Sequence, residues 1–136
     1  MMFGLFMQQM RLRPLRRLPI AFGWLTMRGD AATVRWMKPI MQQVEIRRDA
    51  VKALRAVSAE PDLMLKAAEC LPSFDRPALV VWAAEDRAMP PEHGRRLAEI
   101  LPQGRLIEVP DSYTLIPEDQ PGELARAIRQ FVRNTP

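Results

Sequence analysis

An acidic residue follows an apolar run in the second half of the chain, where it could serve in acid–base chemistry. Asp86 comes after the apolar residues Leu79–Trp82 and the small pair Ala83-Ala84. Small residues at the end of a strand allow a tight turn, which would present the carboxylate to an imidazole as the orienting acid of a nucleophile–base–acid triad. The alternative is structural, with Asp86 accepting backbone N–H bonds at a turn or at the start of the helix near Pro90.

The other members of such a triad are not evident in the sequence. His93 is the only histidine and therefore the only imidazole available as a general base, but it lies in the first turn of a predicted helix, where side chains are usually exposed. None of the three serines lies in a Gly-x-Ser-x-Gly elbow. Because there is also no Gly-rich phosphate loop and no spaced metal-ligand cluster, we expect neither a cofactor nor a metal.

Three aromatic residues in the N-terminal half are candidates for an apolar substrate pocket. They are Phe22, Trp24 and Trp36. The alternative is that they fill a core, which is the common role of aromatic side chains at helical spacing.

The composition is that of a globular protein with two halves of different charge. The 136 residues are 48% hydrophobic and 26% charged, with a net charge of +4. Residues 1–60 contain 11 Lys and Arg against 4 Asp and Glu, whereas residues 61–136 contain 9 against 12. Because no stacking aromatics alternate with the basic residues, we expect no nucleic-acid partner.

The single cysteine and the N-terminal residues indicate the cellular location that we expect for the protein. Cys70 has no second cysteine, which excludes a disulfide framework, so a reducing cytoplasm is the simplest location. The apolar start, Met1–Met7, lacks a preceding basic region and is much shorter than the roughly 18 apolar residues of a membrane span. We therefore expect neither a signal peptide nor a membrane partner.

The elements that would position these residues change in type along the chain. Residues 1–72 read as helices separated by prolines, with amphipathic patterns over Ala32–Met41 and Ile46–Val57 and a third helix from Asp62 to Cys70. From residue 73 the pattern becomes strand, helix, strand, helix. The predicted elements are Leu79–Trp82, Pro91–Leu101, Arg105–Val109 and Pro121–Val132. This order predicts an α/β fold with two parallel strands joined by a right-handed crossover.

Two motifs in residues 74–133 resemble the C-terminal part of an α/β-hydrolase. The first, Trp82-Ala-Ala-Glu-Asp86, is similar to the family's Trp-Gly-x-x-Asp, with Ala83 in place of glycine. The second, from Val109-Pro-Asp-Ser-Tyr-Thr114 to Gln120-Pro121, is similar to Asp-x-Gly-His followed by an acidic Gln-Pro segment. The resemblance implies that Asp86 stands at the position of the triad acid.

Residues 11–72 resemble the helical lid, or cap, that many bacterial members insert between core strands. Arg16–Thr26 and Arg47-Arg-Asp49 are similar to lid sequences. The resemblance implies two domains, a lid-like segment over residues 1–72 and the C-terminal βαβα part of the core over residues 73–136.

The sequence departs from the family at the catalytic base and nucleophile. Thr114 occupies the position of the family's histidine, and Tyr113 replaces the preceding glycine. A threonine hydroxyl cannot accept and return a proton near neutral pH as an imidazole does. The nucleophile elbow and the oxyanion-hole loop have no counterpart in the 136 residues.

These features predict a truncated or degenerate α/β-hydrolase that is inactive alone. With a missing N-terminal half supplied, the resemblance implies hydrolysis of an ester, carbon–halogen or similar bond of a small apolar substrate. The alternative is a non-enzymatic interaction or assembly protein, which would dock through its sheet edge and a Met-rich helical face. Exposed apolar surface would then also favour self-association.

Overall fold

The fold is taken from a computed structural model of the chain. It describes residues 15, 17–19, 21–28, 31, 34–35, 38–39, 42–60 and 62–135. The chain divides into two compact units, one made of Met1–Trp24 and Gly29–Glu69 and the other of Leu25–Arg28 and Cys70–Pro136. A short segment from the predicted lid, Leu25–Arg28, therefore groups with the C-terminal part of the chain.

The described elements of the first unit are helical. A 3₁₀ helix, η2, spans Phe22–Trp24, and two α-helices follow, α3 over Val44–Ala59 and α4 over Leu63–Glu69. Helix α3 contains the predicted helix Ile46–Val57, whereas much of the predicted helix Ala32–Met41 lies outside the described residues. No residue of α4 is buried, so packing contributes little to its stability.

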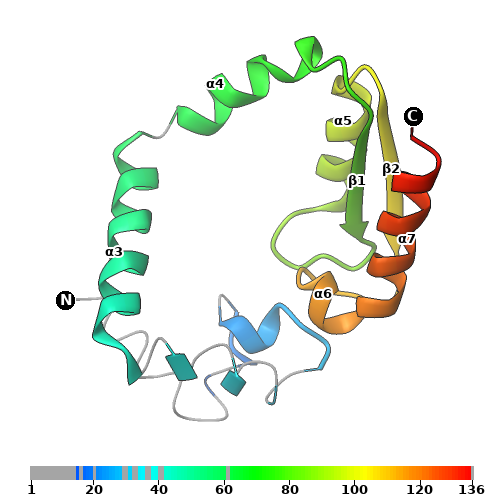
Figure 1. The fold of residues 1–136 in the computed structure, drawn as a ribbon. Helices are drawn as coiled ribbons and strands as arrows, with labels where there is room; N and C mark the ends of the chain where they lie inside the picture. Colours follow the sequence, from blue (N-terminus) through cyan, green and yellow to red (C-terminus); the bar gives the residue numbers. More distant parts are fainter. Residues whose placement is uncertain are drawn as a thin grey trace. The chain divides into compact units, whose positions relative to one another are not determined.

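The second unit is built on two parallel strands (Figure 1). Strand β1 spans Ala78–Ala83 and strand β2 spans Gly104–Val109, with Ala78 paired to Gly104 and Ala83 to Val109. Helix α5, over Pro91–Ile100, connects the two strands. After β2 come a short helix, α6 (Ile116–Asp119), and the last helix, α7 (Pro121–Arg133).

Side chains alternate between the two faces of the sheet, and helices pack on both faces. On one face, Trp82 meets Gly94 of α5, and the Glu108 carboxylate accepts a bond of 2.8 Å from Arg95 of the same helix. On the other face, Val81 and Ile107 pack in a cluster with Leu124 of α7. A strand covered on both faces has no polar face, which explains why β1 is apolar throughout.

The core of this unit lies where the strands end. Ala83, Val109 and Ile116 are all buried there and form one cluster. Ala83 and Val109 are the last residues of β1 and β2, and Ile116 is the first residue of α6. Packing among them therefore anchors the carboxyl end of the sheet. The loops that leave the strands at this end begin from fixed positions.

Candidate functional site

The carboxylate of Asp86 lies just beyond the carboxyl end of β1, in a turn that its own side chain stabilises. Its Oδ1 atom accepts hydrogen bonds from the backbone N–H groups of Ala88 at 2.8 Å and Met89 at 3.0 Å. These two bonds are those of a turn-capping carboxylate, which was the structural alternative considered from the sequence. A third bond distinguishes this residue from an ordinary turn cap.

The third bond comes from Thr114, which reaches Asp86 from the loop after β2. The Thr114 Oγ1 hydroxyl donates to Asp86 Oδ1 at 2.7 Å. Asp111 of this loop adopts a left-handed backbone conformation, with φ of 51°. Aspartate is one of the few residues other than glycine that enter this region readily. The structure therefore joins the two positions that the family resemblance singled out.

Three consecutive residues after β1 contact the loop after β2. Besides the bond of Asp86, Glu85 Oε2 accepts a bond of 3.2 Å from the backbone N–H of buried Ser112. The guanidinium of Arg87 lies 3.5 Å from the centre of the Tyr113 ring, in a cation–π contact. The two loops thus hold each other, and the position of residue 114 relative to Asp86 does not depend on one bond.

The contact between Thr114 and Asp86 corresponds to one of the two hydrogen bonds that the imidazole of a catalytic triad makes. In a triad, one imidazole nitrogen donates to the acid while the other accepts the nucleophile's proton. The Thr114 hydroxyl makes the first of these bonds, but it has no basic nitrogen with which to accept the nucleophile's proton. As it stands, the pair can orient a hydroxyl group and cannot relay a proton near neutral pH.

A second carboxylate, Asp119, anchors the loop that carries Thr114. Asp119 is 2% exposed, and its Oδ2 atom accepts a bond of 2.9 Å from the backbone N–H of Tyr113. Its Oδ1 atom accepts bonds from the Thr26 hydroxyl and from the backbone N–H of Met27 at 2.8 Å. A buried carboxylate is tolerated when several donors satisfy it, as they do here.

The segment Leu25–Arg28 belongs to this site through the same anchor. The Arg28 guanidinium donates twice to the backbone carbonyl of Asp119, at 3.1 and 3.3 Å. The Leu25 carbonyl accepts a bond of 3.0 Å from the backbone N–H of Leu115. These four residues therefore contact the segment that follows β2, although they precede it by about ninety positions in the sequence.

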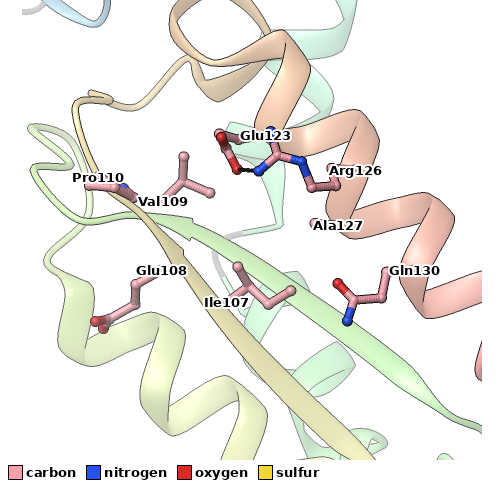
Figure 2. Close-up of a pocket in the computed structure, with 8 residues that line it drawn as sticks. All are labelled: Ile107, Glu108, Val109, Pro110, Glu123, Arg126, Ala127 and Gln130. Atoms are coloured by element: carbon pink, nitrogen blue, oxygen red, sulfur yellow. Dashed lines mark hydrogen bonds and ion pairs between the residues drawn. The ribbon is translucent and has the colours of Figure 1, made fainter.

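A small pocket lies elsewhere in this unit, between β2 and α7 (Figure 2). It has a volume of about 190 Å³, and a Glu123–Arg126 ion pair of 2.6 Å lies at one end. The lining residues are Ile107, Glu108, Val109, Pro110, Glu123, Arg126, Ala127 and Gln130. Because this volume is below the roughly 300 Å³ of ordinary ligand sites and the lining excludes Asp86 and Thr114, we do not assign the pocket to substrate.

The remaining sequence candidates are His93 and the three aromatic residues of the N-terminal half. His93 is exposed on α5. Trp24 is half-buried in the first unit, the side chain of Phe22 is not described, and Trp36 lies outside the described residues. A pocket lined by these aromatics stays a prediction. Within the described ranges, no three His, Cys, Asp or Glu side chains gather as they would around a metal ion.

In the part of the chain that the structure describes, no helix is both long and apolar enough to cross a bilayer.

Sequence reasoning missed the buried anchor at Asp119 and its partner Thr26. Asp119 was visible only as part of an acidic stretch before Gln120-Pro121. Its burial depends on Leu25–Arg28, and no local pattern connects residues so far apart in sequence. A buried pair of this kind leaves no periodic signal, which is why only the folded structure reveals it.

Comparison with known sequences gives one curated relative. No protein-family model matches the chain. Over 65 residues the chain is 35% identical to the uncharacterized hydrolase YugF of Bacillus subtilis (strain 168), a match that covers 48% of this chain and 24% of that protein. The chain therefore spans about a quarter of the length of this relative.

Solved structures similar to this chain include α/β-hydrolases. The α/β hydrolase MGS-MChE2, from the metagenome of Mar Chica lagoon sediments in Morocco, aligns over 76% of this chain and 45% of its own, with a TM-score of 0.56 and 22% identity. A thermophilic esterase from Thermogutta terrifontis aligns over 49% of this chain and 25% of its own, with a TM-score of 0.48 and 33% identity.

The chain has an α/β-hydrolase fold relationship over about half of its length. Its two parallel strands and flanking helices match the C-terminal portion of α/β-hydrolase folds, which confirms the predicted α/β class. The assignment of residues 1–72 as a lid stays a prediction.

Proposed function

We propose that this chain carries the acid-bearing portion of a hydrolase site in which the catalytic base has been replaced. In this proposal, Asp86 holds the position of the triad acid and Thr114 the position of the base. The observation that carries the proposal is the 2.7 Å bond from Thr114 Oγ1 to Asp86 Oδ1. It joins the loops after two adjacent parallel strands, the edge at which open α/β sheets collect their ligands.

The proposed reaction class is nucleophilic hydrolysis of an ester, a carbon–halogen bond or a similar bond in a small apolar substrate. Within the 136 residues there is no Gly-x-Ser-x-Gly elbow and no imidazole at residue 114. We therefore expect the purified chain to hydrolyse activated esters no faster than the uncatalysed reaction. An activity of the chain that Asp86→Asn abolishes would contradict this expectation.

A chimera tests the roles of the two residues. In a full-length esterase of the α/β-hydrolase fold, residues 71–135 of this chain replace the matching C-terminal segment, so that the host supplies the nucleophile. The chimera with Thr114 should be inactive, and Thr114→His should restore ester hydrolysis by roughly 10³-fold or more, since loss of a triad member costs at least this much.

Asp86→Asn provides the matched control for the restored chimera. Added to Thr114→His, it should lower kcat by about 10⁴-fold without lowering the melting temperature of the chimera, because the orienting acid is lost. Equal activity of the chimeras with threonine and histidine at this position would show that residue 114 is not the base position. Melting curves of all three proteins distinguish loss of catalysis from loss of fold.

A further inference from the structure

Residue 114 is held through both of its neighbours in the chain. The backbone N–H of Tyr113 donates to Asp119 Oδ2 at 2.9 Å, and the backbone N–H of Leu115 donates to the Leu25 carbonyl at 3.0 Å. Neither acceptor lies in the loop after β2, because Asp119 ends α6 and Leu25 lies in the N-terminal half of the chain. The backbone on each side of Thr114 is therefore fixed from outside the loop that carries it.

The two acceptors are also joined to each other. The Thr26 hydroxyl and the backbone N–H of Met27, which follow Leu25 directly, both donate to Asp119 Oδ1. One carboxylate thus binds the N-terminal segment with one oxygen and the loop after β2 with the other. Asp119 and Thr26 are each 2% exposed, so bulk water does not compete for the bond between their side chains.

The loop after β2 depends on such bonds, because residues 110–115 belong to no helix or strand. Glu85 and Arg87 also contact this loop, but only at residues that precede Thr114. The bonds to Asp119 and to the Leu25 carbonyl hold it on both sides of that residue. Loss of the Asp119 bonds should therefore move residue 114 without releasing the whole loop.

From these contacts we infer that Asp119 and Thr26 are positioning residues for the base position at residue 114. They act through the backbone of Tyr113 and Leu115. The inference rests on the proposed function, because it takes residue 114 as the place of the base. An imidazole there must keep one nitrogen on Asp86 while the other faces the nucleophile, which requires its backbone to stay within about 0.5 Å of one position.

A role in stability alone would have a different consequence. If Asp119 only stabilised the fold, its substitution would lower the free energy of unfolding, and the folded molecules would keep the interaction between residues 86 and 114. A positioning role predicts that this interaction weakens in molecules that are still folded. The test must therefore measure the interaction itself.

The interaction is measured in the full chain with Thr114→His, by following the pKa of the introduced imidazole by NMR. The pKa is determined with aspartate and with asparagine at residue 86, and the difference between the two values measures the interaction. We expect a difference of roughly one unit, because the carboxylate favours the charged imidazolium. Asp119→Asn should lower this difference by at least about half.

The physical reason is that an amide replaces one of the two acceptor oxygens by a donor. With asparagine at residue 119, either the Tyr113 N–H or the donors of Thr26 and Met27 lose their acceptor. Any direct effect of the Asp119 charge on the imidazole is the same with either residue at position 86. It therefore cancels in the difference.

Two further variants serve as control and substitute. Asp75→Asn makes the same change at a side chain that is 89% exposed, and it should leave the difference unchanged. Thr26→Val removes a donor to Asp119 while keeping the net charge and the shape of the side chain, and it covers the case in which Asp119→Asn fails to fold. It should lower the difference in part.

The outcomes separate this inference from the proposed function on which it rests. If aspartate at residue 86 raises the pKa of the imidazole by the same amount with Asp119→Asn, with Thr26→Val and with neither, the positioning role is wrong and the proposed function stands. If aspartate and asparagine at residue 86 give the same pKa without any other change, the proposed function is contradicted, and the inference with it.

Discussion

At the scale of single residues, the contact between Thr114 and Asp86 is the feature on which the proposed function rests. The Thr114 hydroxyl donates to Asp86 as an imidazole N–H would, so the acid remains satisfied. The same carboxylate also accepts from Ala88 and Met89, and these bonds stabilise the turn whether or not a base is present. Asp86 therefore has a structural role that does not depend on catalysis.

Asp119 should matter to stability more than any exposed acid of the chain. Asp119→Ala leaves the buried Thr26 hydroxyl and the part-buried N–H groups of Tyr113 and Met27 without an acceptor, so we expect a loss of roughly 2–4 kcal/mol in the free energy of unfolding, since each unsatisfied buried group costs about 1–3 kcal/mol. Denaturant titration measures this loss. Asp75→Ala, at a side chain that is 89% exposed, is the matched control and should change stability by less than about 0.5 kcal/mol.

A loss for Asp119→Ala no larger than that for Asp75→Ala would contradict the anchoring role. It would mean that water or other groups replace the carboxylate at no cost. The Thr26 hydroxyl provides a further check, because Thr26→Val should show part of the same loss.

At the scale of elements, α5 packs closely on β1 because one of its residues is a glycine. A Cβ atom at Gly94 would lie 2.6 to 2.9 Å from three atoms of the Trp82 ring, which is closer than real Cβ atoms approach. The indole is fixed in turn by a bond of 3.3 Å from its Nε1 to the carbonyl of Met89. The helix therefore sits against the ring with no room for a methyl group.

Gly94→Ala should destabilise the fold although alanine favours helices. The helical preference contributes about 1 kcal/mol, whereas overpacking a tight contact costs about 1–3 kcal/mol, so we expect a net loss of up to about 2 kcal/mol. Gly122→Ala is the control, because nothing lies within 4 Å of a Cβ atom there. Thermal unfolding of both variants, with and without Trp82→Leu, measures the effect.

Equal stability of the Gly94→Ala and Gly122→Ala variants would contradict the close packing of α5 on Trp82. Trp82→Leu should reduce the cost of Gly94→Ala, since it removes the ring atoms that the new methyl group meets. If Trp82→Leu did not reduce the cost of Gly94→Ala, the strain would arise from contacts other than those with the Trp82 ring.

The sequence predicts the elements of the C-terminal unit well, because each has a strong local signal. The apolar run ending at Trp82 predicts β1, and the proline at position 91 predicts the start of α5. The strand pattern places Asp86 just beyond β1, whereas only the family resemblance singles out Thr114. Helix α6 is missed because four residues are too few for a periodic pattern. The grouping of Leu25–Arg28 with this unit is missed because it depends on Asp119, far away in sequence.

At the scale of the whole molecule, helix α4 and the C-terminal unit differ in how much of their surface is buried. The C-terminal unit has a buried cluster of Ala83, Val109 and Ile116, whereas α4 has no buried residue. Exposed apolar side chains such as Met64 and Leu65 lie on that helix, at 63% and 66% exposure. Helices without burial depend on propensity alone and open readily.

Hydrogen exchange should therefore separate the chain into two classes of amide. We expect amides of α4 to exchange rapidly and those of Val80 and Trp82 in β1 to be strongly protected. The Met27 amide should be protected together with that of Tyr113, because both bind Asp119. If the Met27 amide instead exchanged as rapidly as the amides of α4, Leu25–Arg28 would belong with the N-terminal unit.

The most direct test of the link between Asp86 and residue 114 is the pKa of an imidazole introduced by Thr114→His in the full chain, followed by NMR. If the Asp86 carboxylate lies where a triad acid does, it should raise that pKa above the ordinary value of about 6.5 by roughly one unit, because it favours the charged imidazolium. Asp86→Asn in the same background should remove the increase. An introduced imidazole that titrates at the same pH with aspartate and with asparagine at position 86 would contradict the assignment of this pair as an acid and the site of a lost base.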